Sequence, residues 1–198
     1  MMIFPGSALQ LPEWLNNFIA SSKTFYAAIE ERMELALELA ARNINNDGSP
    51  FGAAIFERSS GRFIAPGINL VLQTNCSVFH AEIVAIILAQ QKLATFDLGA
   101  EGLPEYELVT TTEPCAMCLG AIPWSGISSL VCGCREEDAR HIGFDEGDKP
   151  DGWVQKLESR SITVTRNILR SKAKNILQKY IDQGGVIYNG KTIAERNI

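Results

Sequence analysis

The sequence lacks an apolar run long enough to cross a bilayer, and it lacks the basic start of a secretory leader. Its longest strongly apolar run, residues 83–89, falls far short of the roughly 20 residues that a membrane-spanning helix needs. Residues 1–17 contain no lysine or arginine and carry Pro5, Pro12 and Glu13. Both absences predict a cytoplasmic protein.

Cysteine and positive charge are also scarce. The five cysteines cannot all pair, so we expect no disulfide framework, and reduced thiols fit the cytoplasm. The 18 basic residues are outnumbered by 23 acidic ones, which gives a net charge of −5 and argues against a polyanionic partner.

One segment departs from this charge balance. Basic side chains crowd residues 156–179, where Glu158 is the sole acid. They form either the solvated face of a C-terminal helix or a phosphate-binding patch. The basic residues are Lys156, Arg160, Arg166, Arg170, Lys172, Lys174 and Lys179.

The 198 residues show no internal repeat and no linker, which predicts a single domain over 1–198. Residues 1–23 are an N-terminal extension in this interpretation, and residues 184–198 are a C-terminal tail. Hydrophobic periodicity predicts helices alternating with strands, and hence an α/β layered domain whose sheet is largely parallel after an initial hairpin. The expected helices are 24–45, 81–93, 115–122, 136–141 and 168–182, and the expected strands are 52–57, 63–72 with a break at Gly67, 106–110, 127–132 and 161–165.

Two short motifs suggest a metal site. His80-Ala81-Glu82 has the form H-x-E, and Pro114-Cys115-Ala116-Met117-Cys118 has the form P-C-x-x-C. One imidazole nitrogen and two thiolate sulfurs suit Zn²⁺ and leave a fourth tetrahedral position for water. This combined signature is typical of zinc deaminases, in which the glutamate is a proton carrier and not a ligand.

The predicted position of each motif at a helix start suits this chemistry. Free N–H groups and the helix dipole lower the pKa of cysteines there and help to supply thiolates. Glu82 lies close enough to act as general base toward the water without binding the metal. Two structural alternatives stay open, because His80 could be a buried core histidine and Cys76 could close the site as a fourth ligand.

The motifs resemble the cytidine/deoxycytidylate deaminase superfamily, and within it the bacterial guanine deaminases that also accept the triazine ammeline. The resemblance extends over roughly residues 24–190. It includes Pro50-Phe51-Gly52, Gly67-Ile68-Asn69, Gly143-Phe144-Asp145-Glu146-Gly147 and Val186-Ile187-Tyr188-Asn189. It implies a three-layer α/β/α fold with a mixed five-stranded sheet, one zinc ion per chain, and a homodimer with or without exchange of the C-terminal segment.

The resemblance also implies roles for individual residues. Asn69 would hydrogen-bond a substrate carbonyl, and Tyr188 would close the pocket. A second proton carrier would come from the acidic loop, where we favour Glu146 over Asp145 because guanine deamination protonates both a ring nitrogen and the departing amine. The remaining implied substrate contacts are Phe51, Trp124 and Phe144 around the base, Asp145 beside it, and the backbone of Ala81.

Three other functions share parts of this pattern. A tRNA adenosine deaminase would use the basic segment 156–179 as its footprint, although Trp124-Ser125-Gly126 stands where those enzymes tend to have a basic residue. A nucleoside or cytosine deaminase would have the same fold. A zinc-binding module without catalysis would use Cys76 as its fourth ligand.

Overall fold

A computed structural model describes residues 9–190, so parts of the expected extension and tail, 1–8 and 191–198, lie outside the described residues. No helix in this range is both long and apolar enough to cross a membrane. The helices are α1 Glu13–Ser21, α2 Ile29–Ile44, α3 Val71–Thr74, α4 Ala81–Leu93, α5 Ala116–Ser125, α6 Glu136–His141, α7 Trp153–Glu158 and α8 Arg170–Asp182. The strands are β1 Gly52–Glu57, β2 Phe63–Ile68, β3 Tyr106–Thr112, β4 Ser129–Cys134 and β5 Thr163–Thr165.

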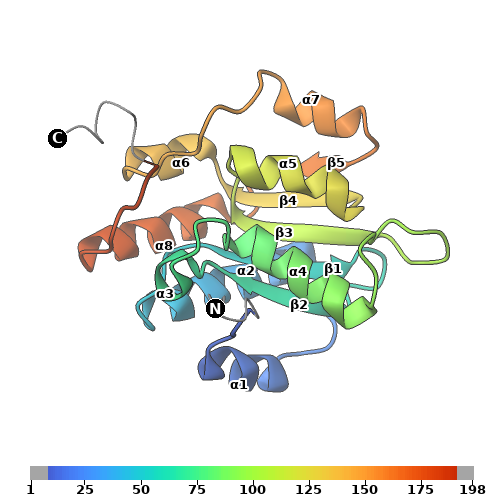
Figure 1. The fold of residues 1–198 in the computed structure, drawn as a ribbon, viewed down its shortest axis with the longest axis horizontal. Coiled ribbons are helices and arrows are strands. Elements are labelled where there is room, and N and C mark those ends of the chain that lie inside the picture. Colours follow the sequence, from blue (N-terminus) through green and yellow to red (C-terminus); the bar gives the residue numbers. More distant parts are fainter. Residues whose placement is uncertain (1–8, 191–198) are drawn as a thin grey trace, which may run out of the picture.

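The five strands form one mixed sheet in the order β2-β1-β3-β4-β5. Strand β1 is antiparallel to both β2 and β3, whereas β3, β4 and β5 are parallel. The mixed five-stranded sheet implied by the resemblance is therefore confirmed, and helices cover both of its faces (Figure 1).

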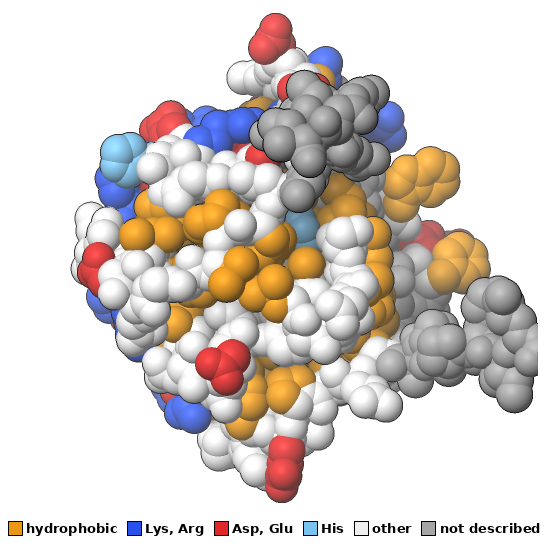
Figure 2. All heavy atoms as spheres, turned by 60° about the vertical axis from the view of Figure 1, so that its left-hand side comes forward, with side chains coloured by type: hydrophobic (Ala, Val, Ile, Leu, Met, Phe, Trp, Pro, Cys, Tyr) orange, Lys and Arg blue, Asp and Glu red, His pale blue; other side chains and the backbone are white. Residues whose placement is uncertain are grey.

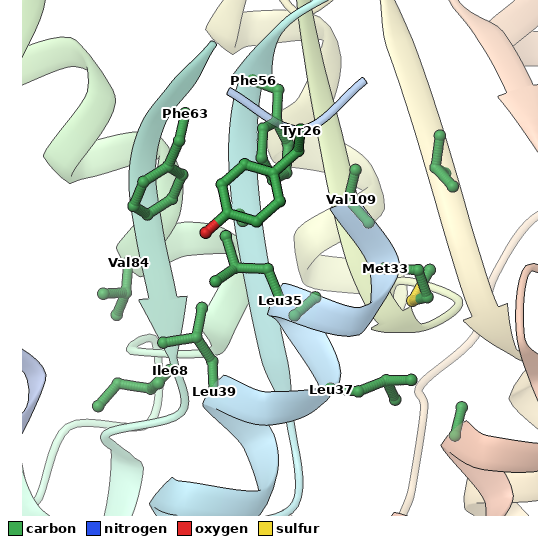
Figure 3. Packing of buried hydrophobic residues seen from close by; sticks show 14 of the residues in the cluster. Tyr26, Met33, Leu35, Leu37, Leu39, Phe56, Phe63, Ile68, Val84 and Val109 are labelled. Atoms are coloured by element: carbon green, nitrogen blue, oxygen red, sulfur yellow. The ribbon is translucent and has the colours of Figure 1, made fainter. Parts of the chain in front are cut away.

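The alternation of side chains along β1 builds a core on each face of the sheet. Ala54 and Phe56 pack with α1, α2 and α8, whereas Ala53 and Ile55 pack with α4, α5 and α7. Figure 3 shows the first of these cores, in which Met33, Leu35 and Leu39 of α2 meet side chains of the sheet. Because successive residues of a strand point to opposite faces, a strand buried on both sides has a continuous apolar sequence.

Several predicted boundaries were wrong. The first long helix begins at Ile29 and not at residue 24, because Phe25 forms a β-bridge with Arg62 and holds the preceding residues extended. Strand β2 ends at Ile68, and residues 71–74 form the short α3 instead of continuing the strand. Helix α7 lies in a segment for which we predicted no element.

One edge of the sheet gathers the functional segments. Strands β2 and β3 both run antiparallel to β1, so their carboxyl ends lie beside the amino end of β1. Gly67 permits α4 to lie directly on β2, since a Cβ atom there would come within 2.1 Å of the Ala81 carbonyl oxygen. This contact brings the start of α4 to the edge where β3 leads into α5.

Candidate active site and metal centre

His80, Cys115 and Cys118 meet at this edge. His80 is the residue before α4, Cys115 is the residue before α5, and Cys118 lies in the first turn of α5. Their ligand atoms all lie within 4.8 Å of one another, and the Cys115 sulfur is 3.4 Å from His80 Nδ1. The structure thus brings together the three residues that the sequence predicts as metal ligands.

Contact between the two cysteines shifts their pKa values in opposite directions. A hydrogen bond from Cys118 and another from His80 lower the pKa of the Cys115 thiol to about 4, against the effect of burial. The pKa of Cys118 is raised, because its thiol donates to Cys115 and is buried. A divalent cation would remove this conflict by stabilising both thiolates.

Two buried carboxyl groups face the same cavity as the metal donors. Glu82 lies in the first turn of α4, where burial and the Cys115 charge raise the pKa of its carboxyl group. Glu146 lies in the loop after α6, where burial, Cys115 and Glu82 raise its pKa to about 8. Glu146 is held beside the metal donors because its carbonyl oxygen accepts a hydrogen bond from the Ala116 N–H at 2.9 Å.

The cavity has a volume of about 350 Å³, which lies at the lower end of the usual range for ligand pockets. Three aromatic rings form one wall. Phe51 and Tyr188 meet the Phe144 ring edge-on, with centroid distances of 4.9 and 5.5 Å.

Hydrophobic side chains gather in the middle of the face of the molecule that bears α3, whereas most charged side chains lie at its rim (Figure 2). Such a site suits a flat, small ligand.

Asn69 supplies a fixed polar group to this cavity. Its Oδ1 accepts a hydrogen bond from the Val71 N–H at 3.2 Å. Its carbonyl oxygen accepts another from Asn43 Nδ2 at 2.9 Å. With Oδ1 engaged, the Asn69 side chain is oriented to offer its NH₂ group, which is a donor suited to a ligand carbonyl.

A family model now identifies this arrangement. The model of the cytidine and deoxycytidylate deaminase zinc-binding region matches residues 27–134, which include Glu82 and all three metal donors. The chain belongs to the cytidine and deoxycytidylate deaminase family.

Relatives within this deaminase family have several substrates. A guanine deaminase of Bacillus subtilis is 38% identical over 128 residues, which cover 61% of this chain and 78% of the relative. A tRNA-specific adenosine deaminase of Agrobacterium fabrum is 33% identical, over 71% of this chain and 93% of the relative. A solved structure of a guanine deaminase from Nitrosomonas europaea superposes with a TM-score of 0.85 at 50% identity, over 89% of this chain and 98% of that chain.

The donor set of this deaminase fits zinc. Two sulfurs and one imidazole nitrogen within 4.8 Å of one another match the preferences of that ion. Among the residues from 9 to 190, the cluster of possible metal ligands contains His80, Cys115 and Cys118 and does not include Cys76. In the described part of the chain, Cys76 therefore does not join the three donors as a fourth ligand.

Two expected substrate contacts do not line the cavity. Trp124 was expected to stack on the base, but it lies on the outer side of α5 with 88% of its side chain exposed. The backbone of Ala81 was also expected to contact the base. Ala81 is buried against Gly67 and does not line the cavity. The aromatic type of Trp124 could not reveal which side of α5 it occupies.

Asp145 and Tyr188 lie at the cavity as expected. The Asp145 carboxylate is already engaged, because it accepts a hydrogen bond from the Gly147 N–H at 2.9 Å and pairs with Arg140 at 3.4 Å. Burial raises the pKa of Tyr188, so its hydroxyl stays protonated. Asn189 holds the tail in place through hydrogen bonds with Asp145 N and Gly143 O.

Six further residues line the cavity that the sequence motifs did not indicate. Thr112 is the most informative, because its buried Oγ1 has no hydrogen-bond partner in the described part of the chain. Its place at the end of β3, three residues before Cys115, was the signal that could have revealed it. The others are Val71, Ser77, Glu113, Asn189 and Gly190.

Proposed function

We propose that this deaminase converts a free purine base, guanine in the first place, to the corresponding oxo compound, xanthine, with release of ammonia. One observation carries the proposal: two buried carboxyl groups, Glu82 and Glu146, face the cavity that the metal donors border. Loss of an amino group from guanine requires a proton on a ring nitrogen and another on the departing amine. Two carboxyl groups supply both positions.

The proton transfers follow from these positions. His80, Cys115 and Cys118 would hold the zinc ion, which when bound would supply a Lewis acid for a water molecule. Glu82 takes a proton from the water while the water oxygen adds to the carbon that bears the amino group. Glu82 then passes this proton to the ring nitrogen. Glu146 protonates the amine, the C–N bond breaks, and the proton of the new hydroxyl group returns to Glu146.

Other cavity residues would select a free base. The Asn69 NH₂ group would donate to the guanine carbonyl, and Phe51 and Phe144 would pack on the ring. Tyr188 and Asn189 would cover the mouth of the cavity.

The relatives support a purine base. The similar proteins include guanine deaminases of Bacillus subtilis and Nitrosomonas europaea, and one solved structure, 51% identical with a TM-score of 0.87, is a complex with 2,6-diaminopurine. The basic segment 156–179 gives the tRNA alternative little support, because many of its cations are already paired. Arg166 forms an ion pair with Glu113, and Lys172 forms one with Glu34. Arg170 and Lys174 both pair with Asp138.

Ammonia release by the zinc-loaded protein tests the proposal. Guanine, ammeline, guanosine, cytosine and adenosine-containing tRNA are supplied in parallel. We expect turnover of guanine, with or without ammeline. Activity on a nucleoside, on cytosine or on tRNA, with guanine inert, would support zinc-dependent deamination and refute the proposed binding of guanine in this cavity. Inactivity on all five substrates would favour a zinc-binding module without catalysis.

A homodimer in the cytoplasm completes the proposal. Phe96, Met117 and Trp124 form the α5 surface, and Phe96 and Trp124 are 87% and 88% exposed. The loop that carries Phe96 adjoins the end of α5, since the Leu98 N–H donates to the Ser125 carbonyl. A second copy of the chain would cover these aromatic side chains. The cytoplasm suits the five cysteines, none of which forms a disulfide, and release of xanthine suits purine breakdown.

A further inference from the structure

Lys149 is a buried cation three residues after Glu146. Its side chain is only 4% exposed, and its Nζ lies 2.6 Å from Glu136 Oε2. The same ammonium group donates a hydrogen bond to the Pro114 carbonyl oxygen at 3.2 Å and lies 5.1 Å from the centre of the Trp153 ring. Burial of a lysine is costly unless partners compensate for it, and Lys149 has three of different kinds.

The contact with Pro114 joins the acidic loop to the metal centre. Pro114 immediately precedes the metal ligand Cys115, and Ala116 immediately follows it. Glu146 binds the Ala116 N–H through its carbonyl oxygen, and Lys149 binds the Pro114 carbonyl through its ammonium group. The loop is thus attached on both sides of Cys115.

The loop backbone is pressed closely against α5 between these two attachments. Gly147 has a φ of +69°, which favours glycine. A Cβ atom there would lie 3.0 Å from the Ala116 Cβ. Glu146 directly precedes this point of close approach. Its position relative to α5 therefore depends on the contacts that hold the loop in place.

The far side of Lys149 is fixed as well. Glu136 also binds Arg140 at 2.7 Å, and Arg140 donates to the Gly147 carbonyl oxygen at 2.7 Å. Although burial raises the pKa of Glu136, Lys149 and Arg140 lower it below its ordinary value, so the carboxylate stays charged. The Lys149 ammonium is therefore clamped between the start of α6 and the residue before Cys115.

We infer that Lys149 is a positioning residue that sets the place of the Glu146 carboxyl group relative to Cys115 and hence to the reacting amine. The inference rests on the proposed role of Glu146 as the proton donor. Lys149 does not line the cavity, so it acts through Glu146 and not by touching the substrate.

Replacement of the ammonium group gives the first test. In the zinc-loaded enzyme we expect Lys149→Met to lower kcat for guanine by about 10- to 100-fold, the usual effect of losing a group that orients an active-site residue, with zinc content unchanged. Lys149→Arg keeps the charge and should restore most of the turnover. Lys172→Met is the matched control, because it removes an exposed ion pair with Glu34 elsewhere, and it should leave kcat unchanged.

A double-mutant cycle separates positioning from mere stability. If Lys149 acts through Glu146, Lys149→Met should cost little further turnover in a Glu146→Gln background. If Lys149→Met fails to fold, Glu136→Gln replaces it in the same cycle, since it removes the carboxylate partner and should show the same dependence on Glu146. A full and independent loss in both backgrounds would overturn the inference and leave the proposed function intact, whereas full turnover by Glu146→Gln alone would refute the proposed role of Glu146 and the inference with it.

Discussion

Glu82 occupies a place where its carboxyl group reaches the metal centre without belonging to it. Its Oε2 lies 3.6 Å from the Cys118 sulfur, and Glu82 itself stands two residues after the ligand His80. Burial and the Cys115 charge raise the pKa of the Glu82 carboxyl group, a usual trait of a catalytic acid or base. The proposed function gives it the first proton transfer.

Glu82→Gln tests that transfer. The amide has the same shape but cannot accept a proton as a base, so we expect kcat to fall at least about 100-fold, within the range typical of general acid–base catalysis. Zinc content and thermal unfolding should be unchanged. Glu101→Gln, at an exposed turn, is the matched control and should keep full turnover. An active Glu82→Gln enzyme would refute the mechanism.

The sequence was most informative for residues whose spacing is set by chemistry. His80, Cys115 and Cys118 were predicted because metal ligands require particular residue types at particular positions. Asn69, Phe51 and Phe144 came only from the resemblance, and the cavity contains all three. Trp124 was misplaced and Thr112 was missed, because whether a side chain faces a cavity depends on tertiary packing that residue type does not encode.

At the scale of elements, one aspartate joins two helices behind the site. Asp138 accepts a hydrogen bond from the Arg135 N–H at the start of α6 and pairs with Arg170 and Lys174 of α8. Burial raises the pKa of Asp138, but these partners outweigh that effect and hold it at about 2. The same α6 carries Glu136 and Arg140, which brace the acidic loop.

Asp138→Asn should therefore destabilise the protein in a pH-dependent way. The carboxyl pKa is lower in the folded state than its unfolded value of about 3.9, so the stabilisation is present above about pH 4 and is lost as the pH falls toward 2. We expect a loss of about 1–2 kcal/mol at pH 7, because the partly exposed cations are screened by solvent. Denaturant unfolding of both proteins between pH 7 and pH 3 measures it.

Loss of zinc at low pH would destabilise both the unaltered protein and Asp138→Asn. It therefore does not contribute to the difference in their free energies of unfolding. Asp182→Asn is the matched control, since Asp182 accepts a hydrogen bond from Gln178 and pairs with no cation among residues 9–190. A deficit for Asp138→Asn that stayed constant down to pH 3 would contradict the assigned pKa.

Elements with a strong apolar pattern were predicted well, and those defined by local contacts were not. Helix α4 is apolar on nearly every side and was placed at its observed bounds. Helices α3 and α7 have only 4 and 6 residues, too few for a periodic pattern, and were not predicted, whereas α6, also of 6 residues, was predicted at its observed bounds. The antiparallel join of β1 to β3 also depends on pairing between distant segments.

At the scale of the whole molecule, the unexplained feature is the α5 surface. Phe96 and Trp124 are 87% and 88% exposed, and α5 carries the metal ligand Cys118 and begins directly after the ligand Cys115. A second copy of the chain placed on this surface would therefore support the helix on which the chemistry depends.

If the proposed homodimer forms through the α5 surface, Trp124→Arg should dissociate it. We expect light scattering to give about twice the 21.7 kDa chain mass for the unaltered protein, and a mass near that of one chain for the variant at the same concentration. An arginine at the centre of an apolar interface leaves a buried charge without a partner, which costs several kcal/mol.

Phe25→Arg is the matched control, because Phe25 is 56% exposed but bridges to Arg62, away from α5. The Phe25→Arg protein should remain dimeric. A dimer that survives Trp124→Arg unchanged would show that the two copies meet through another face and that the α5 surface has a different partner.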